Sequence, residues 1–282
     1  MQTATVQMCS SPDVAANLAS AHALLTQAAA HGAELAVLPE YFCGMGRHEH
    51  DKLAWAEDFG SGPIQEALAC WAQELGLWIV AGTLPLRSPA PQRVFNTSLV
   101  FNPQGQCCAR YDKIHLFRFG NEREQYDEAA AITPGTRPVV AEVTDRSGHR
   151  WRVGLSVCYD LRFPELYRHH AQAGADIMVV PSAFTCTTGQ AHWEVLLRAR
   201  AIENHALCWP RRKAGNMKTG GAPGATAWPS TPGAKSWDSA RRPAQAWCWP
   251  RWSQRICSGC ASNCPRWSTA PFHKKRDAPA DK

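Results

Sequence analysis

Residues 157–167 have the sequence VCYDLRFPELY, and no other stretch indicates the fold of this chain more directly. The apolar run at 151–157 predicts a buried strand, and the segment from Pro164 onward predicts a helix. Cys158 is therefore expected at a sharp turn between the two. A side chain at the end of a strand can meet substrate while the sheet beneath holds it rigid, so Cys158 is a candidate nucleophile.

Two other apolar strands are followed by charged side chains. The sequence LPEYF at 38–42 places Glu40 directly after one strand, and YDKIHL at 111–116 places Lys113 at the end of another. A carboxylate can carry a proton, and an ammonium can stabilise an oxyanion and favour a thiolate. The three strand ends together predict a reaction centre.

Each of these residues also has a plainer interpretation. A cysteine in an apolar strand is usually an inert small hydrophobe. A glutamate after a strand is usually solvated, and a lysine there usually marks a sheet edge. His115 and His192 leave open a Cys–His pair instead, because such a pair needs only proximity in the folded chain.

The three motifs, in this order, resemble those of the nitrilase superfamily of carbon–nitrogen hydrolases, and within it the branch of small amidases. The sequences PSAF at 181–184 and HWEVLLRAR at 192–200 extend the resemblance, which covers about residues 3–205. The family fold is α/β, a four-layer αββα sandwich. The joint occurrence of the motifs, through this resemblance, favours the catalytic interpretation over the plainer ones.

The resemblance also implies a role for each residue. Glu40 is the general base, Lys113 the oxyanion stabiliser and Cys158 the nucleophile. Glu128 falls where the family places a second glutamate that supports the lysine, and the backbone N–H of Tyr159 would help to hold the oxyanion.

Five further residues are candidates for substrate contact because they lie just past strand ends or on helices next to the nucleophile. For each of them, packing or a surface ion pair is an equally good interpretation. The candidates are Tyr41, Arg162, Phe184, Thr185 and Glu194.

Apolar periodicity predicts strands and helices that alternate in pairs, which fits two sheets flanked by helices better than one doubly wound sheet. Helices are expected at about 14–31, with Asp13 as cap, and at 63–75, 164–173 and 190–204. Strands are expected at 3–9, 35–38, 77–81, 96–101, 108–113, 139–143, 151–157 and 177–180.

The charge of the chain changes sign near residue 207. Of its 30 lysines and arginines and 24 aspartates and glutamates, residues 1–207 hold 16 and 21, and residues 208–282 hold 14 and 3. The overall charge of +6 therefore describes neither part. We expect 1–207 to be a carbon–nitrogen hydrolase domain that is incomplete at its C-terminal side, and 208–282 to be a basic, irregular or disordered tail.

The tail lacks the residues that build a core. Residues 208–282 contain no leucine, valine, tyrosine or glutamate, but hold seven of the 12 tryptophans and nine of the 20 prolines. Such a composition cannot bury a core. Back-translation of residues 208–239 with GC-rich codons permits a second reading frame whose product resembles the continuing family sequence. A shifted reading frame near 206–208 is therefore our interpretation of the tail.

The composition of the tail raises two other interpretations, a nucleic-acid-binding module and a zinc site. Arginine and lysine interleaved with tryptophan can bind nucleic acid through phosphate contacts and stacking, which would make this an inactive amidase-like protein with a basic binding module. The trio Cys257, Cys260 and Cys264 with His273 is too irregular for a structural zinc site, which needs two well-spaced ligand pairs. We expect neither metal nor nucleic acid to be bound.

Composition also indicates the cellular setting. Twelve cysteines without a repeated spacing favour free thiols in a reducing compartment. The N-terminus has no basic region followed by an apolar stretch, and no apolar segment approaches about 20 residues. We therefore expect a cytoplasmic protein without membrane contact. The resemblance implies no cofactor, a small amide and water as reactants, and a homodimer for an intact family member.

Overall fold

The computed structural model describes residues 1–120, 125–184, 186–212 and 235–236. The chain divides into a compact unit of Met1–Cys248 and a second unit of Trp249–Lys282, which lies outside the described residues. In the described part of the first unit, two larger sheets and one short hairpin make up the β-structure.

The first sheet is mixed. Its central strands β1, β2 and β3 run parallel, and β3, β5, β4 and β6 pair antiparallel. Along the sheet, the strands are β13 (Lys235–Ser236), β1 (Thr3–Thr5), β2 (Leu35–Val37), β3 (Trp78–Val80), β5 (Val94–Phe101) and β4 (Leu84–Arg87), with β6 (Cys107–Asp112) paired to β5.

The second sheet has parallel pairing of β12, β11 and β10, while β9 pairs antiparallel with β10. In order, its strands are β12 (Leu207–Arg212), β11 (Ile177–Ser182), β10 (Arg150–Leu155) and β9 (Val140–Thr144). A separate antiparallel hairpin joins β7 (Arg118–Gly120) and β8 (Gln125–Asp127).

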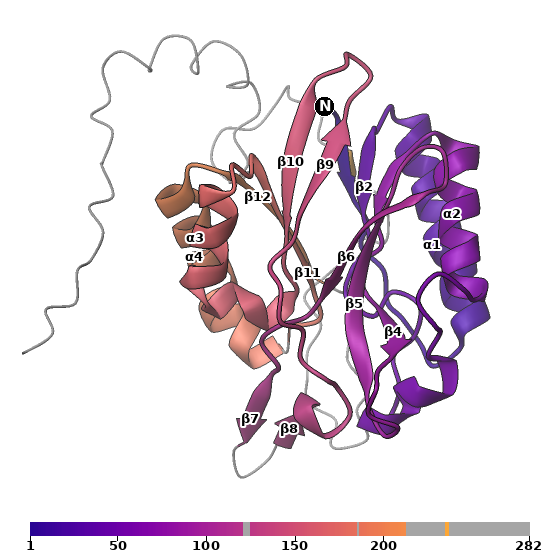
Figure 1. The fold of residues 1–282 in the computed structure, drawn as a ribbon, viewed down its shortest axis with the longest axis vertical. Helices are drawn as coiled ribbons and strands as arrows, with labels where there is room; N and C mark the ends of the chain where they lie inside the picture. The colour runs from indigo at the N-terminus through magenta and orange to yellow at the C-terminus, as the bar shows by residue number, and fades with distance from the viewer. Residues whose placement is uncertain (121–124, 185, 213–234, 237–282) are drawn as a thin grey trace, which may run out of the picture. The chain divides into compact units, whose positions relative to one another are not determined.

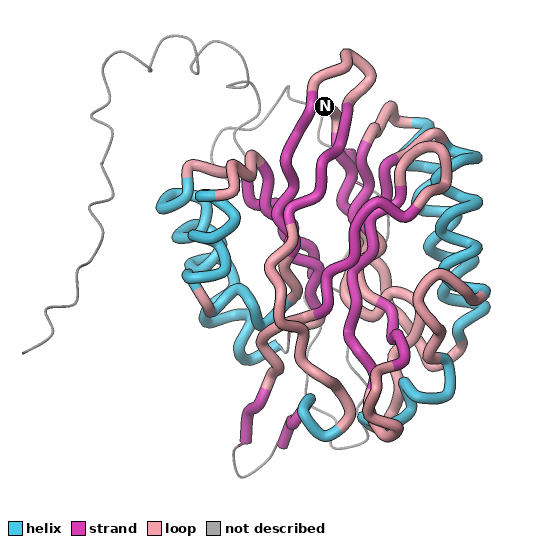
Figure 2. Tube along the Cα trace, in the orientation of Figure 1, coloured by secondary structure: helices cyan, strands magenta, loops and turns pink. Residues whose placement is uncertain are grey.

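The two sheets lie face to face, and a pair of helices covers each outer face (Figures 1 and 2). The helices α1 (Val14–Ala30) and α2 (Pro63–Leu75) lie on the first sheet, and α3 (Pro164–Gln172) and α4 (Cys186–Asn204) lie on the second. Three 3₁₀ helices interrupt the loops at η1 (Glu49–Trp55), η2 (Glu128–Ala130) and η3 (Cys158–Arg162). The predicted four-layer αββα sandwich is confirmed.

The side chains of a central strand alternate between two hydrophobic cores. Leu35 and Val37 of β2 belong to the core that includes Val153, Ile177 and Val179 of the second sheet. Their neighbours Ala36 and Leu38 belong to the core beneath α1 and α2. Because successive side chains of a strand point to opposite faces, the continuous apolar run at 35–38 serves two cores at once.

Local signals set the helix ends. The Asp13 side chain accepts from the backbone N–H of Ala16 at 3.1 Å, which confirms the predicted cap of α1. Pro63 occupies the first turn of α2, and Gly76 ends that helix with a φ of 60°. The sequence did not indicate η3, which places one 3₁₀ turn between the second sheet and α3.

The strand β12 crosses the domain boundary expected at 207. It pairs with β11 from Leu207 to Arg212, and among the described residues it is an edge of its sheet. Pro210 lies inside this strand; a proline cannot donate to a ladder and is therefore confined to edges. Farther along, Lys235 and Ser236 of β13 pair with β1. No described helix is long and apolar enough to cross a membrane.

Restoring the reading frame near residue 207 should change the solubility of the protein. We expect the 282-residue chain to be insoluble or inactive, because its tail offers no leucine or valine to continue the sheet beyond the β12 edge. Five missing core side chains at about 1.5–3 kcal/mol each would match a whole stability of about 5–15 kcal/mol. The frame-restored chain should be soluble and active.

Both chains would be expressed side by side and compared by soluble yield, thermal melting and turnover. A soluble, cooperatively melting and active 282-residue chain would show that the tail is genuine.

Candidate active site

Glu40 lies directly beyond β2, at a tight turn. The next residue, Tyr41, has a φ of 54°, a left-handed conformation that is uncommon for a non-glycine residue and clusters at functional sites. The Tyr41 N–H donates to Thr83 Oγ1 at 2.8 Å and so fixes the turn. Because Glu40 is only 1% exposed, its carboxylate is enclosed by protein.

Three donors hold the Glu40 carboxylate in one orientation. Oε1 accepts from Lys113 Nζ and from Asn96 Nδ2, each at 3.0 Å. Oε2 accepts from the backbone N–H of Ala183 at 2.8 Å. Asn96 belongs to the first sheet and Ala183 follows β11 of the second. Both halves of the sandwich therefore position the carboxylate.

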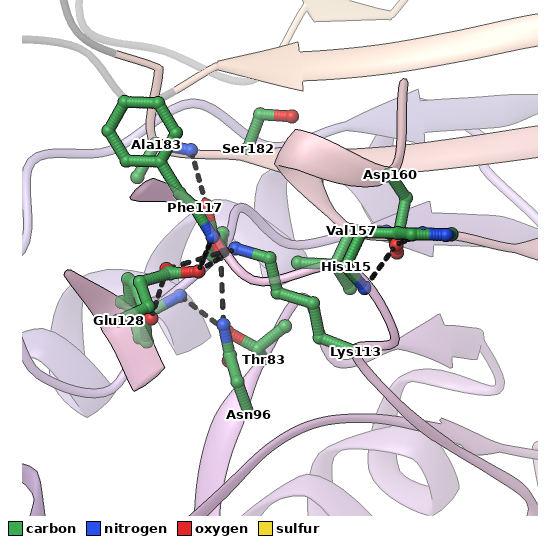
Figure 3. Close-up of polar contacts among 12 residues, drawn as sticks. Thr83, Asn96, Lys113, His115, Phe117, Glu128, Val157, Asp160, Ser182 and Ala183 are labelled. Carbon is green, nitrogen blue, oxygen red and sulfur yellow. Dashed lines mark hydrogen bonds and ion pairs between the residues drawn. The ribbon is translucent and has the colours of Figure 1, made fainter. Parts of the chain in front are cut away.

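Lys113 is fully buried and charged. Besides Glu40, its ammonium contacts Glu128 Oε1 at 2.9 Å and Oε2 at 2.8 Å (Figure 3). Burial by itself lowers the pKa of Lys113, but the carboxylates of Glu128 and Glu40 outweigh burial and raise the pKa well above the usual lysine value. The site thus keeps a permanent positive charge in a region without solvent.

Glu128 lies beside Lys113, as the sequence resemblance implied. Its Oε2 also accepts from the backbone N–H of Phe117 at 2.7 Å, and its Oε1 accepts from the Tyr41 hydroxyl at 3.1 Å. With these contacts the carboxylate has donors on both oxygens. Glu128 is therefore a rigid counter-ion rather than a side chain free to move.

Cys158 begins η3 and is 8% exposed. Its φ of 50° turns the chain sharply out of the second sheet, which is the turn expected from the sequence. Burial raises the pKa of the Cys158 thiol well above its usual value. The carboxylate of Glu40 adds to the rise, and Lys113 opposes it. The expectation that Lys113 favours the thiolate is right in direction, but its charge is outweighed, so the resting group is a thiol.

Asp160 ties the Cys158 turn to the Lys113 segment. Its fully buried carboxylate accepts from the Tyr111 hydroxyl at 2.6 Å and the Val157 N–H at 2.8 Å. It also contacts the His115 N–H at 3.0 Å and His115 Nδ1 at 2.7 Å (Figure 3). Tyr111 and His115 lie on either side of Lys113. A single carboxylate therefore fixes where the thiol and the ammonium lie relative to each other.

A cavity of about 90 Å³ opens over these groups. Glu40, Glu128 and Cys158 line it, whereas Lys113, which contacts both carboxylates, does not. Its aromatic lining residues are Tyr41, Phe117, Tyr126, Tyr159 and Phe184. The segment before and within η1 contributes Met45, Gly46, Arg47, His48, Glu49 and Lys52, and Ala183 lines the cavity beside Glu40.

The structure separates the other predicted substrate contacts. Tyr41 and Phe184 line the cavity, whereas Arg162 and Glu194 do not. The Arg162 guanidinium lies over the rings of Tyr159 and Phe184, 5.7 and 5.8 Å from their centroids. Glu194 is exposed and paired with an arginine one turn along α4, so the expected contact with substrate is replaced by a surface ion pair. Thr185 lies outside the described residues.

Neither histidine of the alternative Cys–His pair lines the cavity. His115 is held by Asp160 and stacks on Phe163 at 3.7 Å, and His192 lies 3.3 Å from an Arg162 nitrogen. In the described part of the chain, no cluster of three or more histidine, cysteine or acidic side chains is placed to hold a metal ion. The cysteines of the tail, at 257, 260 and 264, lie outside the described residues.

Asn96, Asp160 and Lys52 are site residues that the sequence did not indicate. Asn96 lies within an apolar strand, and its contact with Glu40 spans 56 residues. Asp160 lies in the quoted motif but carries no catalytic signature. Lys52 lies on η1, in a stretch of sequence that shows no periodicity. The resemblance supplied the reacting groups, whereas these supporting groups emerge only from the fold.

Comparison with known proteins supports one family. A model of the carbon–nitrogen hydrolase family matches residues 2–227. A protein of Synechocystis named deaminated glutathione amidase is 40% identical over 203 residues, which are 71% of this chain and 73% of that protein. An omega-amidase of Xenopus tropicalis is 34% identical over 200 residues, covering 71% of this chain and 69% of the relative.

The fold agrees with a solved structure. The crystal structure of yeast Nit3, described as a member of branch 10 of the nitrilase superfamily, superposes with a TM-score of 0.68 at 29% identity. The superposition covers 78% of each chain.

Substitution of the three central residues should separate the two catalytic hypotheses. In the frame-restored chain, Cys158→Ala should abolish turnover, Glu40→Gln should nearly abolish it, and Lys113→Ala should lower it by about 10²-fold or more. Measured rates of ammonia release decide the outcome. If Glu40→Gln keeps full activity while His192→Ala loses it, the Cys–His pair is the right interpretation.

The pH dependence of Cys158 alkylation offers a second test. Because burial and Glu40 raise the thiol pKa, the rate of iodoacetamide labelling should still rise through pH 9. Glu40→Gln should move the curve to lower pH, since the carboxylate that opposes ionisation is gone. Lys113→Ala should move it to higher pH. Peptide mass spectrometry separates Cys158 from the exposed cysteines, and a plateau below pH 7 would contradict the assignment.

Proposed function

The chain belongs to the carbon–nitrogen hydrolase family and is a hydrolase of the amidase type, and we propose that it releases ammonia from the terminal amide of a small carboxylic or keto acid through a cysteine acyl-enzyme. The observation that carries this proposal is the buried Lys113 ammonium held between Glu40 and Glu128, with both carboxylates and Cys158 lining one cavity.

In the first step, Glu40 takes the proton of Cys158 as the sulfur attacks the amide carbon. The thiol is neutral at rest, so proton removal and attack belong together rather than starting from a stored thiolate. The carbonyl oxygen becomes negative, and the Lys113 ammonium and the Tyr159 N–H stabilise it. Losing one such donor typically costs about 10²–10³ in rate.

In the second step, the tetrahedral intermediate collapses. The C–N bond breaks, and the nitrogen takes the proton from Glu40 and leaves as ammonia. Cys158 now carries the acyl group as a thioester. Water then enters, Glu40 removes its proton, and the thioester is hydrolysed to the free acid and the thiol.

Glu128 supports the lysine without touching the reacting atoms. Its two oxygens bind the Lys113 ammonium, while the Phe117 N–H and the Tyr41 hydroxyl hold the carboxylate itself. This arrangement keeps Lys113 charged while Glu40 gains and loses a proton. The oxyanion site therefore keeps the same charge throughout the reaction.

The substrate we propose is a small linear omega-amide. The sequence of residues 181–200 is more similar to deaminated glutathione amidase than to omega-amidase, and the Synechocystis and Xenopus relatives are 40% and 34% identical to this chain. The narrow cavity, walled by aromatic side chains, suits an unbranched chain with a terminal amide.

We further propose that an intact family member with this body is a cytoplasmic homodimer. Val195 and Ile202 on α4 are 67% and 72% exposed and lie two turns apart on one side of the helix. Exposed apolar side chains in such a row are typical of a surface covered by another chain.

A substrate panel tests the proposed function. Ammonia release would be measured with deaminated glutathione, alpha-ketoglutaramate and simple nitriles. Turnover of one or both amides, with nitriles inert, is the expected result, and mass spectrometry should detect one acyl equivalent on Cys158. Hydrolysis of nitriles alone, or no covalent adduct during turnover, would contradict the proposal.

A further inference from the structure

Lys52 is a charged residue in the cavity that the reaction chemistry does not use. It lies on η1 and lines the cavity that contains Cys158. It is only 7% exposed. Burying an ammonium is unfavourable unless a partner compensates it, so a buried lysine beside a reacting group requires an explanation.

The partner of Lys52 in this structure is a poor one for a permanent ion pair. Its Nζ lies 2.5 Å from Glu49 Oε2, one turn back on the same 3₁₀ helix. The Glu49 side chain is 39% exposed, so water competes for it. Lys113, by contrast, is enclosed by Glu40 and Glu128, two buried carboxylates. Glu49 can leave Lys52 at a low cost in free energy.

The helix that carries Lys52 is fixed in place. The Asp51 carboxylate accepts from the backbone N–H of Arg47 at 2.7 Å and of His48 at 2.9 Å, which closes the start of η1. The Glu57 backbone beyond η1 pairs with β4. A cation on an anchored helix is preorganised, which lowers the entropic cost of binding an anion.

Tyr41 links Lys52 to the reaction centre. Its hydroxyl donates to Glu128, and the face of its ring lies 4.9 Å from Lys52 Nζ. Tyr41 therefore joins Lys52 to the carboxylate that holds Lys113.

We propose that Lys52 is the specificity-determining residue that binds a carboxylate at the far end of the substrate, and that the Glu49 carboxylate occupies Lys52 only while the cavity is empty. This inference rests on the proposed amide hydrolysis and deepens it, because it assigns recognition of the substrate carboxylate to one residue. The substrate carboxylate displaces Glu49 and takes its place as the partner of Lys52. Arg162, the cation expected from the sequence, does not line the cavity.

The test compares succinamate with butyramide, two amides of equal chain length that differ in a terminal carboxylate. The measured quantity is the ratio of kcat/KM for succinamate to kcat/KM for butyramide. Lys52→Met keeps the aliphatic stem over Tyr41 and removes the charge, and should lower the ratio about 10-fold or more, a loss of about 1.4 kcal/mol. Glu49→Gln frees Lys52 and should raise the ratio by lowering KM for succinamate.

Opposite effects of the two variants exclude a merely structural pair, because breaking such a pair from either side would impair both amides alike. Lys52→Arg keeps the charge and should retain most of the preference for succinamate. Arg87→Met is the matched control: it removes an exposed cation that is paired with Asp58, and should leave the ratio unchanged. All variants would be made in the 282-residue chain and in the frame-restored chain, with melting curves as a check on folding.

Three results would overturn the inference. An unchanged ratio in Lys52→Met, with both amides hydrolysed, refutes the role of Lys52 and leaves the proposed function intact. A ratio that falls in Arg162→Met instead assigns the carboxylate to that arginine. If the unsubstituted frame-restored chain hydrolyses neither these two amides nor deaminated glutathione nor alpha-ketoglutaramate, the proposed function fails, and this inference fails with it.

Discussion

One buried ammonium between two buried carboxylates determines the arrangement of the rest of this structure. Lys113 is fully enclosed and pairs with both Glu40 and Glu128. Removing Lys113 would leave two buried carboxylates without their shared counter-ion in a medium of low polarity. The group therefore forms only when β2, β6 and η2 are all in place, which makes the reaction centre a consequence of the complete sandwich.

The same constraint explains why the site needs supporting residues from both sheets. Asn96 and the Ala183 N–H fix the Glu40 carboxylate from opposite sheets, and Asp160 joins the Lys113 segment to the Cys158 turn. The left-handed backbone conformations of Tyr41 and Cys158 are strained, and the surrounding hydrogen bonds hold them in place. Rigidity at the strand ends is thus built from hydrogen bonds across the sandwich, and the thiol can remain neutral until substrate arrives.

The sequence predicted the parts of this site that lie at strand ends. Glu40, Lys113 and Cys158 each follow an apolar run, so strand periodicity locates them and the family resemblance assigns their roles. Asn96 could not be predicted, since its contact with Glu40 joins residues 56 positions apart. Helical periodicity places Glu194 on α4 but does not say which turn of the helix faces the cavity. In the structure Glu194 pairs with Arg198 on the surface. The layers were predicted from strands and helices that alternate in pairs along the chain, whereas the short η3 turn had no sequence signal.

The charge of the cavity connects the chemistry to the choice of substrate. Three carboxylates, those of Glu40, Glu49 and Glu128, line the cavity. The lining cations are the buried Lys52 and the exposed Arg47, whereas Lys113 contacts Glu40 and Glu128 without lining the cavity. In the proposed reaction Lys113 stabilises the oxyanion, so an anionic substrate entering this space would meet repulsion from these carboxylates unless Lys52 is released to it. Exchange of Glu49 for the substrate carboxylate removes that repulsion without changing the number of buried ion pairs. A neutral amide gains nothing from the exchange, and the cavity can therefore select substrates by charge at a point remote from the bond that breaks.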